Sequence, residues 1–562
     1  MINKRINNLR KKFSKLNIDG YVIPKNDEFF SEHANRDRLK IISNFSGSYG
    51  LAIILKKKNY LFVDGRYTIQ AKKESGKNFK IIEIHKQLPK TIFKNITLGF
   101  DPKLFTSKQL KNYFSKKIKL NVVSSNLIDQ IYRDKIKATK PFYSLKKEIV
   151  GESHISKLKK IRNFLKKNKT DYLFISAPEN VAWILNIRGN DNPCSPIPNC
   201  NLIIGKKNEL FLISEKKKAS KIIKEKKLRK SQLFAPTDFL FLMKKLKHKI
   251  FITDPQSCSV FHEKIIKSNF KIKNKNDPCY LLKSIKNSTE IQNMIDSHFS
   301  DGLALTKFIY WIKNKNKKII NEIDAEKKLE KIRKLNKNYL FPSFNTIAGT
   351  GSNAAIVHYR ATKKTKKIIK KNDIFLCDSG GQYKYGTTDV TRTICFSKQK
   401  KTIKNIFTKV LKGHIAVVET DLKKNSTGKK IDVNARKFLK RDGLDYAHGT
   451  GHGVGFFLNV HEGPQSISKY NSIKIRPGMI LSNEPGYYKK GQYGIRIENL
   501  IYVKKDFRFE NLTFAPIEKD LINYNLLNQN EKNYLFKYHL NIYYKYSSFL
   551  NFEEKRWLAG LI

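Results

Sequence analysis

The sequence predicts two related α/β domains, followed by a larger α+β domain and an aromatic C-terminal extension. A chain of 562 residues is too long for one hydrophobic core, so several domains are expected. One supersecondary pattern occurs twice before residue 285, and glycines, histidines and carboxylates gather between predicted strands after it. The predicted domains are residues 1–135, 136–285, 286–505 and 506–562.

The repeated pattern carries the prediction of two related domains. Its first copy contains LNIDGYVIPKNDEFF and YGLAIILKKKNYLFVDGRY, and its second contains NKTDYLFISAPENVAW and NLIIGKKNELFLIS. Each copy consists of a basic helix, a short buried strand opened by Asp19 or Asp171, the start of a helix, and a hairpin. Recurrence of one plan indicates two domains of common architecture, divided near residue 135.

Two helices are predicted at the start of the third domain. Ser288 or Thr289 is expected to cap the first helix, and Asp324 the second. Apolar residues recur at every fourth position of the first helix, which predicts one buried face. The residues of this face are Ile291, Ile295, Phe299 and Leu303.

The formal net charge of +64 is the most unusual property of the composition. A basic patch would indicate nucleic acid or an anionic surface as partner. The lysines, however, are spread along the whole chain and mixed with abundant Asn and Ile, which is typical of a protein from an A+T-rich genome. We therefore expect solvated surface lysines and no specific nucleic-acid partner, with a polyanion site as the alternative.

Three features of the sequence predict a cytoplasmic protein with no membrane segment. No run of about 18 apolar residues occurs. The basic N-terminus, MINKRINNLRKKFSKLNIDGYVIP, lacks the apolar stretch of a secretory signal. The six cysteines are scattered without a CxxC pair, which fits a reducing compartment and predicts no structural disulfide.

Five potential metal ligands lie in glycine- and proline-rich surroundings in the third domain. They are Asp378, Asp389, His452, Glu484 and Glu498. The two aspartates are eleven residues apart and the two glutamates fourteen, and both spacings suit hairpins that return the pair to one end of a sheet. Asp378 follows the apolar run IFLC and Glu498 follows GIRI, so both are predicted on buried strands. Buried carboxylates need cations or hydrogen-bond donors.

The composition of this ligand set predicts a centre with two divalent metal ions. Four carboxylates and one imidazole carry a charge of about −4, which matches two divalent cations. Oxygen-rich ligation with one nitrogen favours Mn²⁺, Co²⁺, Fe²⁺ or Zn²⁺ over a thiolate zinc site. An ordinary salt-bridged carboxylate is the alternative for each residue taken singly. Three further histidines lie in neighbouring segments: His358, His448 and His461.

Several other catalytic motifs are absent from the sequence. His448 and His452 are four residues apart but lack the glutamate of HExxH. The glycines at 451, 453 and 455 do not form GxGxxG, and no phosphate loop or GxSxG nucleophile motif occurs. The glycines around His452 instead predict close backbone approach and a sharp turn.

Four segments resemble the M24 metallopeptidases of the pita-bread fold, and their spacing is closest to the aminopeptidase P group. The segments are VHYRAT, CDSGGQYKYGTTDVTRT, HGTGHGVGFFLNVHEGP and NEPGYYKKGQYGIRIENL. FSGSYG, VDGRY and AWILNIRGND are similar to the two creatinase-like, ribonuclease-H-like N-terminal domains of that group. The tail from LTFAPIEKDLINYNLL to Trp557 resembles the C-terminal extension of its three-domain cytosolic form. We expect this tail to pack against the catalytic domain or a second subunit.

The resemblance implies a role for each candidate residue. Asp378, Asp389 and Glu498 would hold one metal ion, with Asp389 and Glu498 bridging to a second that His452 and Glu484 complete. Glu484 would also transfer a proton, and His461 would donate a hydrogen bond to the developing oxyanion. His358 would position the substrate and His448 would line the pocket. Arg496 would neutralise and orient the carboxylates.

The activity implied by the resemblance is metal-dependent removal of the residue that precedes proline at a peptide N-terminus, by a hydroxide held between the metal ions. The expected partners are peptides with proline at the second position, Mn²⁺ as the first choice of metal, and a second copy of the chain in a homodimer. A prolidase, which cleaves Xaa-Pro dipeptides, is the nearest alternative. Methionine aminopeptidases lack such N-terminal domains, and creatinase-like relatives lack this metal set. A non-catalytic nucleic-acid- or protein-binding relative is the most distant alternative.

Overall fold

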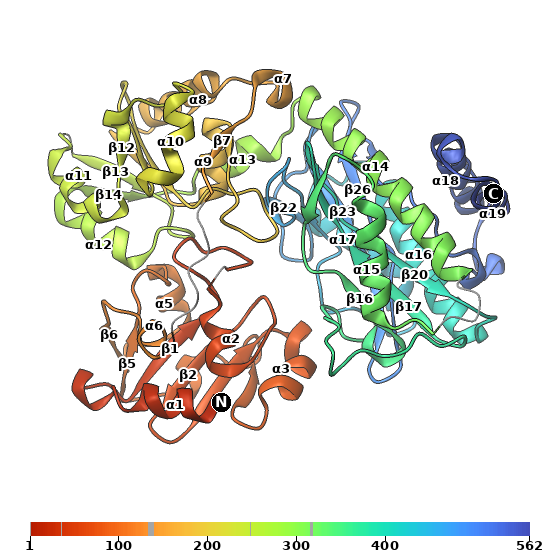
Figure 1. Ribbon diagram of the computed structural model, residues 1–562, viewed down its shortest axis with the longest axis horizontal. Coiled ribbons are helices and arrows are strands. Elements are labelled where there is room, and N and C mark those ends of the chain that lie inside the picture. The colour runs from red at the N-terminus through yellow and green to blue at the C-terminus, as the bar shows by residue number, and fades with distance from the viewer. Residues whose placement is uncertain (1, 35, 133–139, 248, 315–318) are drawn as a thin grey trace. The chain divides into compact units, whose positions relative to one another are not determined.

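The computed structural model describes residues 2–34, 36–132, 140–247, 249–314 and 319–562 (Figure 1). The chain divides into two compact units, Met1–Cys279 and Tyr280–Ile562. The domain boundary predicted near residue 135 lies outside the described residues.

The first unit contains two six-stranded sheets of the same strand order among the residues described. One has the order β4-β3-β2-β1-β5-β6 and the other β12-β11-β10-β8-β13-β14. Strand β1 pairs antiparallel with β2 and parallel with β5, and β8 pairs in the same senses with β10 and β13. The predicted repetition of one α/β plan is therefore confirmed strand by strand. The strands are β1 (Gly20–Pro24), β2 (Leu51–Leu55), β3 (Asn59–Val63), β4 (Lys80–Glu83), β5 (Ile96–Phe100), β6 (Ile118–Val122), β8 (Tyr172–Ile175), β10 (Asn201–Gly205), β11 (Leu210–Ile213), β12 (Leu233–Phe234), β13 (Ile250–Thr253) and β14 (Lys271–Asn274).

The aspartate that opens the first strand of each repeat has the same structural role in both. Asp19 accepts a hydrogen bond at 2.9 Å from the amide of Thr97, on the neighbouring parallel strand. Asp171 accepts one at 2.9 Å from the amide of Ile250, also on the neighbouring parallel strand. Each carboxylate also pairs with a lysine of the adjoining hairpin, Lys56 or Lys206. In each sheet, a single carboxylate therefore connects the three central strands at one end of these strands.

Helices pack against both sheets of the first unit. The longest, α8, begins after the N-cap Ser153 and carries the buried residues Leu158, Ile161 and Leu165 at helical spacing. The helices of this unit are α1 (Ile2–Arg10), α2 (Arg38–Ser43), α3 (Thr68–Ser75), α4 (Pro89–Ile92), α5 (Ser107–Tyr113), α6 (Leu127–Ile131), α7 (Lys147–Val150), α8 (His154–Lys167), α9 (Pro178–Leu185), α10 (Lys216–Lys224), α11 (Phe239–Lys245), α12 (Val260–Asn269) and α13, which continues into the second unit (Cys279–Ser284).

The second unit is built from antiparallel sheets with helices over them (Figure 1). Strand β17 (Ile374–Ser379) lies between β16 (Ile347–Thr350) and β20 (Val390–Cys395), and β23 (Ile480–Asn483) lies between β21 (Gly451–Gly453) and β26 (Asn499–Val503). The other strands of this unit are β15 (Tyr339–Pro342), β18 (Gly381–Tyr383), β19 (Gly386–Thr387), β22 (Glu462–Ile467), β24 (Gly486–Lys489), β25 (Tyr493–Arg496) and β27 (Phe509–Asn511). Its long helices are α14 (Ser288–Lys313), α15 (Glu322–Arg333), α16 (Lys401–Val418), α17 (Gly428–Lys440) and α18 (Gln529–Tyr546), followed by α19 (Phe552–Ala559).

The caps predicted for α14 and α15 are wrong by one to three residues. The N-cap of α14 is Asn287, whose side chain accepts from the amide of Glu290. The N-cap of α15 is Asn321, and the predicted cap Asp324 lies three residues later and completes a capping box. In both cases an asparagine precedes the predicted residue and forms the reciprocal bonds.

The buried face predicted for α14 is displaced around the helix. Its four predicted residues are half-buried, whereas the fully buried stripe includes Met294, His298, Asp301, Leu305 and Phe308. The displacement arises because the most enclosed stripe contains a charged residue, Asp301, which forms an ion pair with Arg333. Hydrophobic periodicity cannot identify a buried face that is partly polar.

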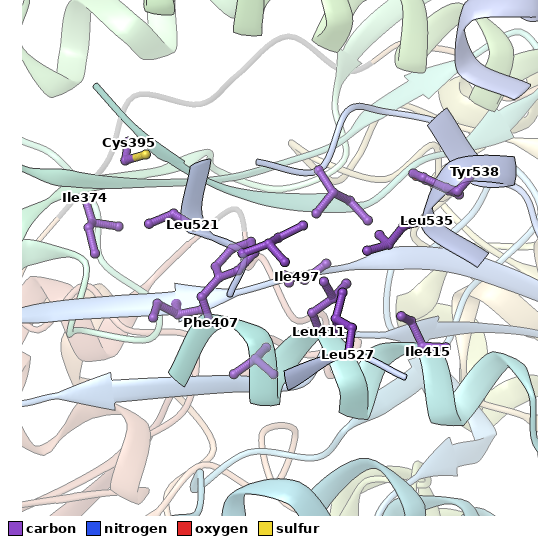
Figure 2. Close-up of a cluster of buried hydrophobic side chains, with 14 of the residues drawn as sticks. Ile374, Cys395, Phe407, Leu411, Ile415, Ile497, Leu521, Leu527, Leu535 and Tyr538 are labelled. Atoms are coloured by element: carbon purple, nitrogen blue, oxygen red, sulfur yellow. The ribbon is translucent and has the colours of Figure 1, made fainter. Parts of the chain in front are cut away.

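The C-terminal extension packs into a core of the second unit, which is the first of the two alternatives expected for it. Figure 2 shows Leu521, Leu527, Leu535 and Tyr538 of the extension beside Ile374, Phe407, Leu411 and Ile497. Ile497 is 1% exposed, so this core holds the chain immediately before Glu498. All six cysteines are among the described residues, and each is a buried thiol. The described helices include none whose length and hydropathy would let it cross a lipid bilayer.

Candidate metal centre

The two aspartates lie at one end of the β17–β20 pair. Asp378 is on β17, directly opposite Thr391 of β20, and Asp389 immediately precedes β20. The eleven-residue spacing corresponds to a connection that leaves the sheet and returns to the same end of it. Both carboxylates are buried, with 7% and 4% of their surfaces exposed.

The two glutamates likewise lie at one end of a strand pair, β23–β26. Asn483 of β23 pairs with Asn499 of β26, so Glu484 and Glu498, each one residue away, lie at the same end. Glu498 is buried, but the prediction that it lies on a strand is wrong, because it is in the two-residue link between β25 and β26. This break in the ladder lets the chain pass from one sheet to another at the site.

His452 lies on β21, which pairs with β22 and β23, and it meets both carboxylate pairs. Its Nε2 is 3.4 Å from Oδ2 of Asp389 and 3.5 Å from Oε1 of Glu484. One potential ligand atom each from Asp389, His452 and Glu498 lies within 4.8 Å of the others. A Cβ on Gly451 would lie 1.9 Å from the carbonyl oxygen of Ser482, so the close backbone approach predicted for these glycines is confirmed.

Arg496 is a buried cation that connects the carboxylates of Asp378 and Glu498. Its Nη2 donates to Oδ2 of Asp378 at 2.5 Å, and its Nε donates to the hydroxyl of Thr391 at 3.0 Å. The Thr391 hydroxyl in turn donates to Oε2 of Glu498 at 2.7 Å. Arg496 is 1% exposed. The planar guanidinium thereby holds Asp378 directly and Glu498 through one hydroxyl.

The electrostatics of the cluster show that it needs further positive charge. Burial and the neighbouring carboxylates raise the pKa of Asp378 to about 7, although Arg496 lowers it. Burial and the same neighbours raise the pKa values of Glu484 and Glu498. Burial lowers the pKa of His452, but Asp389 and Glu484 outweigh it and raise the value to about 9. Arg496 and a protonated His452 together carry less positive charge than four carboxylates carry negative charge.

One oxygen atom provides a test of whether the residues fit a metal ion. Oδ1 of Asp378 is buried and accepts no hydrogen bond from any residue that the structure describes. A buried carboxylate oxygen without a donor is costly, and a cation is the other partner that it can take. The donor set of four carboxylates and one imidazole, with this oxygen turned away from Arg496, fits divalent cations that prefer oxygen ligands.

The three additional histidines lie around this cluster at different distances. The ring of His461 packs against that of His452, with centroids 4.2 Å apart. His448 has Nδ1 at 3.9 Å from Oε2 of Glu484 and Nε2 at 2.9 Å from the hydroxyl of Tyr488. The carbonyl of Val357, which directly precedes His358, accepts from Nη1 of Arg496 at 3.5 Å. The structure therefore brings His448 and His461 to the five residues and places the residue next to His358 against Arg496.

Three hydroxyl groups of the site were not predicted from the sequence. Thr391 lies two residues after Asp389, so strand alternation is a signal that would have placed both on one face. Ser482 donates to Oε1 of Glu484 at 3.1 Å and accepts from the amide of His452 at 3.0 Å. Tyr488 accepts from Nη1 of Arg496 at 2.6 Å. Ser482 lies two residues before Glu484, so the same alternation would have placed it on that face, whereas no sequence periodicity indicates the contact of Tyr488.

Comparisons with known families divide the chain into four matched segments. The model for metallopeptidase family M24 matches residues 292–505, and the model for the C-terminal region of peptidase M24 matches residues 506–560. Two models for the creatinase/prolidase N-terminal domain match residues 5–131 and 133–290. These matches confirm the predicted fold class of two creatinase-like domains followed by a pita-bread catalytic domain.

Individual relatives match over almost the whole chain. A protein of Laccaria bicolor named probable Xaa-Pro aminopeptidase P is 35% identical over 99% of this chain and 92% of its own length. The crystal structure of X-prolyl aminopeptidase from Caenorhabditis elegans, described as a cytosolic enzyme with a di-nuclear active site, matches with a TM-score of 0.89 and 28% identity, covering 100% of this chain and 99% of that one. The prolidase from Pyrococcus horikoshii matches with a TM-score of 0.53 and 25% identity, covering 65% of this chain and 99% of that one.

Proposed function

Because this chain belongs to metallopeptidase family M24, we propose that it is an Xaa-Pro aminopeptidase that releases the residue before proline from peptide N-termini. The observation that carries the proposal is the cluster of four carboxylates and one imidazole, in which three carboxylates are buried and an Asp378 oxygen lacks a donor among the described residues. Similarity to aminopeptidase P over the whole chain, and to a prolidase over 65% of it, favours the aminopeptidase over the dipeptidase.

The proposed ligands form two overlapping groups. Asp378, Asp389 and Glu498 would hold one metal ion, and Asp389, Glu498, His452 and Glu484 would hold the second. When bound, two divalent ions supply Lewis-acid polarisation of the scissile carbonyl and a hydroxide nucleophile at neutral pH. Arg496 keeps the shared carboxylates oriented through Asp378 and Thr391.

Glu484 is the proposed proton carrier of the hydrolysis. Its Oε1 accepts from Ser482, so Oε2 is the oxygen that we assign to proton transfer. In the balanced reaction, the nucleophile's oxygen bonds to the carbonyl carbon, the C–N bond breaks, and a proton passes through Glu484 to the proline nitrogen. The side chains of Glu484 and His452 are 18% and 19% exposed, whereas Asp389 and Glu498 are buried, so we place the substrate on the Glu484 side.

The histidines would bind the carbonyl and the peptide around it. His461 packs on His452 and is the proposed donor to the developing oxyanion. His448 would line the pocket beside Glu484, and His358 would position the substrate. An Xaa-Pro bond is a tertiary amide without an N–H group, so peptidases that read that donor cannot select it. This absence explains why such a bond needs a dedicated pocket.

The experiment that tests the function compares three peptides. Protein stripped with chelator is supplied with Mn²⁺ and given Arg-Pro-Pro, Ala-Pro or Ala-Ala-Ala. We expect metal-dependent release of arginine from Arg-Pro-Pro and little cleavage of the other two. A preference for Ala-Pro would make the chain a prolidase instead.

The matched control for this experiment is the Glu484→Gln variant, which should lose activity while the fold is kept. Equal rates for the variant and the wild type would show that the hydrolysis comes from another source. Absence of hydrolysis with any divalent metal, together with salt-dependent nucleic-acid binding, would favour a binding protein and give the charge of +64 a role.

The finer properties of the enzyme are also proposals. We expect Mn²⁺ as the native metal, with Co²⁺, Fe²⁺ and Zn²⁺ as the alternatives to compare in the same assay. A cytosolic location is supported by the description of the Caenorhabditis elegans relative. We expect a homodimer by resemblance to the family, and light scattering of the purified chain should then show a mass twice the 65.4 kDa of one chain.

A further inference from the structure

A buried polar network contacts the residues adjacent to the two candidate aspartate ligands, Ser379 and Thr388. Its centre is Asp301 of α14, which is 2% exposed. The carboxylate accepts from Nε and Nη2 of Arg333 at 2.7 and 3.2 Å, from the Tyr383 hydroxyl at 2.8 Å and from the Thr388 hydroxyl at 2.9 Å. Four donors saturate the oxygens of one carboxylate.

Two of these donor residues, Tyr383 and Thr388, belong to the connection between Asp378 and Asp389, and the third, Arg333, also contacts its other end. Thr388 directly precedes Asp389. At the other end Ser379, which directly follows Asp378, accepts from Nη2 of Arg333 at 3.1 Å. The two ends are also joined to each other, because the amide of Gly381 donates to the Thr388 hydroxyl at 2.9 Å. One ion pair, Asp301–Arg333, thus holds the residues next to both aspartates.

The packing around this connection leaves little room for adjustment. Ser379 is fully buried, and Arg333, Tyr383 and Thr388 are each 1% exposed. A Cβ on Gly380 would lie 1.9 Å from the carbonyl oxygen of Thr388 and 2.3 Å from the hydroxyl of Ser343. A shift of the connection would therefore break buried hydrogen bonds or create clashes, and the two aspartates would shift with it.

We infer that Asp301, Arg333, Tyr383 and Thr388 form a positioning network that sets the separation of Asp378 and Asp389, and with it the affinity of the centre for divalent metal. The inference rests on the proposed function, because it assumes that the two aspartates bind metal. None of the four side chains is among the proposed ligands. They act on the metal through the backbone on either side of Asp378 and Asp389.

Thr388 offers a matched pair of substitutions for the test. Thr388→Val has nearly the same shape but loses the hydroxyl, whereas Thr388→Ser retains it. The control is Thr306→Val on the same helix as Asp301, since Thr306 is also fully buried and, among the described residues, its hydroxyl donates to the carbonyl of Gly302, at 2.8 Å. Tyr383→Phe is a second variant that removes a different donor to Asp301.

The measurement is the dissociation constant of Mn²⁺, by calorimetric titration of chelator-stripped protein, together with the thermal unfolding of each variant. We expect Thr388→Val and Tyr383→Phe to weaken Mn²⁺ binding by about 10- to 100-fold. Thr388→Ser and Thr306→Val should bind Mn²⁺ as the wild type does. If Thr388→Val binds like the wild type and only its unfolding changes, the network is structural and the inference is overturned. If the wild type itself binds no divalent metal, the proposed metal centre is overturned, and this inference with it.

Discussion

Lys286 and Glu462 form an ion pair in which Nζ lies 2.5 Å from Oε1, with 0% and 1% of the two side chains exposed. Lys283 pairs with the other oxygen of the same carboxylate at 2.8 Å. Glu462 directly follows His461, the proposed oxyanion donor. The carboxylate therefore links β22, which begins directly after His461, to Lys283 and Lys286 near the start of the second unit.

Glu462→Gln should destabilise the protein more than Lys286→Met does. The glutamine leaves two buried ammonium groups without their shared counter-ion, at a cost of about 3 to 5 kcal/mol. Lys286→Met leaves Glu462 paired with Lys283, so its cost should be smaller. Urea unfolding of both variants measures the order. Glu510→Gln, which breaks a half-exposed pair with Lys504, should cost about 1 kcal/mol or less. A larger loss for Lys286→Met than for Glu462→Gln would show that the shared carboxylate is not the centre of the cluster.

Arg496→Lys should impair the metal centre even though the charge is kept. Lysine cannot donate simultaneously to Asp378, Thr391 and Tyr488 as the guanidinium does. We expect kcat/KM for Arg-Pro-Pro and the affinity for Mn²⁺ each to fall by about 10- to 100-fold. Arg508→Lys is the control, because Arg508 is exposed and pairs only with Asp506 among its described contacts. Unchanged Mn²⁺ affinity in Arg496→Lys would contradict the assigned role.

Tyr538→Phe should loosen the C-terminal extension. The Tyr538 hydroxyl accepts from Nη2 of Arg392 at 2.9 Å and from the amide of Ala515 at 3.2 Å, in a buried site. Loss of this acceptor leaves a buried amide unsatisfied, which costs about 1 to 3 kcal/mol. Thermal unfolding and hydrogen exchange over 529–546 report the effect. Tyr544→Phe, at a side chain 85% exposed on the same helix, should behave as the wild type. Equal rates of hydrogen exchange over 529–546 in Tyr538→Phe and Tyr544→Phe would show that the Tyr538 hydroxyl does not anchor the extension.

Acid should weaken the attachment of α18 through His539. Burial lowers the pKa of this imidazole to about 4, and its Nε2 accepts from the amide of Ile517 at 3.2 Å. Since the folded pKa lies below the ordinary value of 6.5, the stabilisation is complete above pH 6.5 and is lost as the pH falls through about 4. A shift of about 2.5 pKa units corresponds to about 3 kcal/mol.

The measurement for His539 is hydrogen exchange over 529–546 at pH values between 7 and 4, corrected for the intrinsic exchange rate. His539→Gln keeps an oxygen that can accept the Ile517 amide but does not titrate, so its protection should depend less on pH. His85→Gln, at an exposed position, should follow the wild type. A pH dependence as steep in His539→Gln as in the wild type would assign the acid effect to other groups.

The repeat of the first unit shows how far local sequence patterns reach. Asp19 and Asp171, each opening an apolar run before a hairpin, were sufficient to predict two domains of one architecture. The recurrence of apolar residues at every fourth position, which is also a local pattern, misplaced the buried face of α14. The difference is that the strands of the repeats are buried through apolar side chains, whereas α14 is buried partly through Asp301, whose partners lie far away in the sequence.

The residues of the candidate site also fall into two groups, those that local sequence patterns predicted and those that they did not. Asp378, Asp389, His452, Glu484 and Glu498 were identified because each lies in a short segment with turn residues and a spacing that suits a hairpin. Thr391, Ser482 and Tyr488 were not, because hydroxyl groups are common in strands and turns, and the two-residue spacing of Thr391 and Ser482 from a candidate ligand does not by itself establish a contact.

The sequence by itself determined the domain plan, the set of candidate ligands and the class of reaction, because these depend on residue types within short segments. Tertiary structure alone decided the partner of each carboxylate. Asp378 is held by Arg496, which is 118 residues away, and Asp301 meets Thr388, which is 87 residues away. Such contacts depend on strand register and on the packing of separate helices and sheets, and no local pattern encodes which oxygen is left for a metal ion.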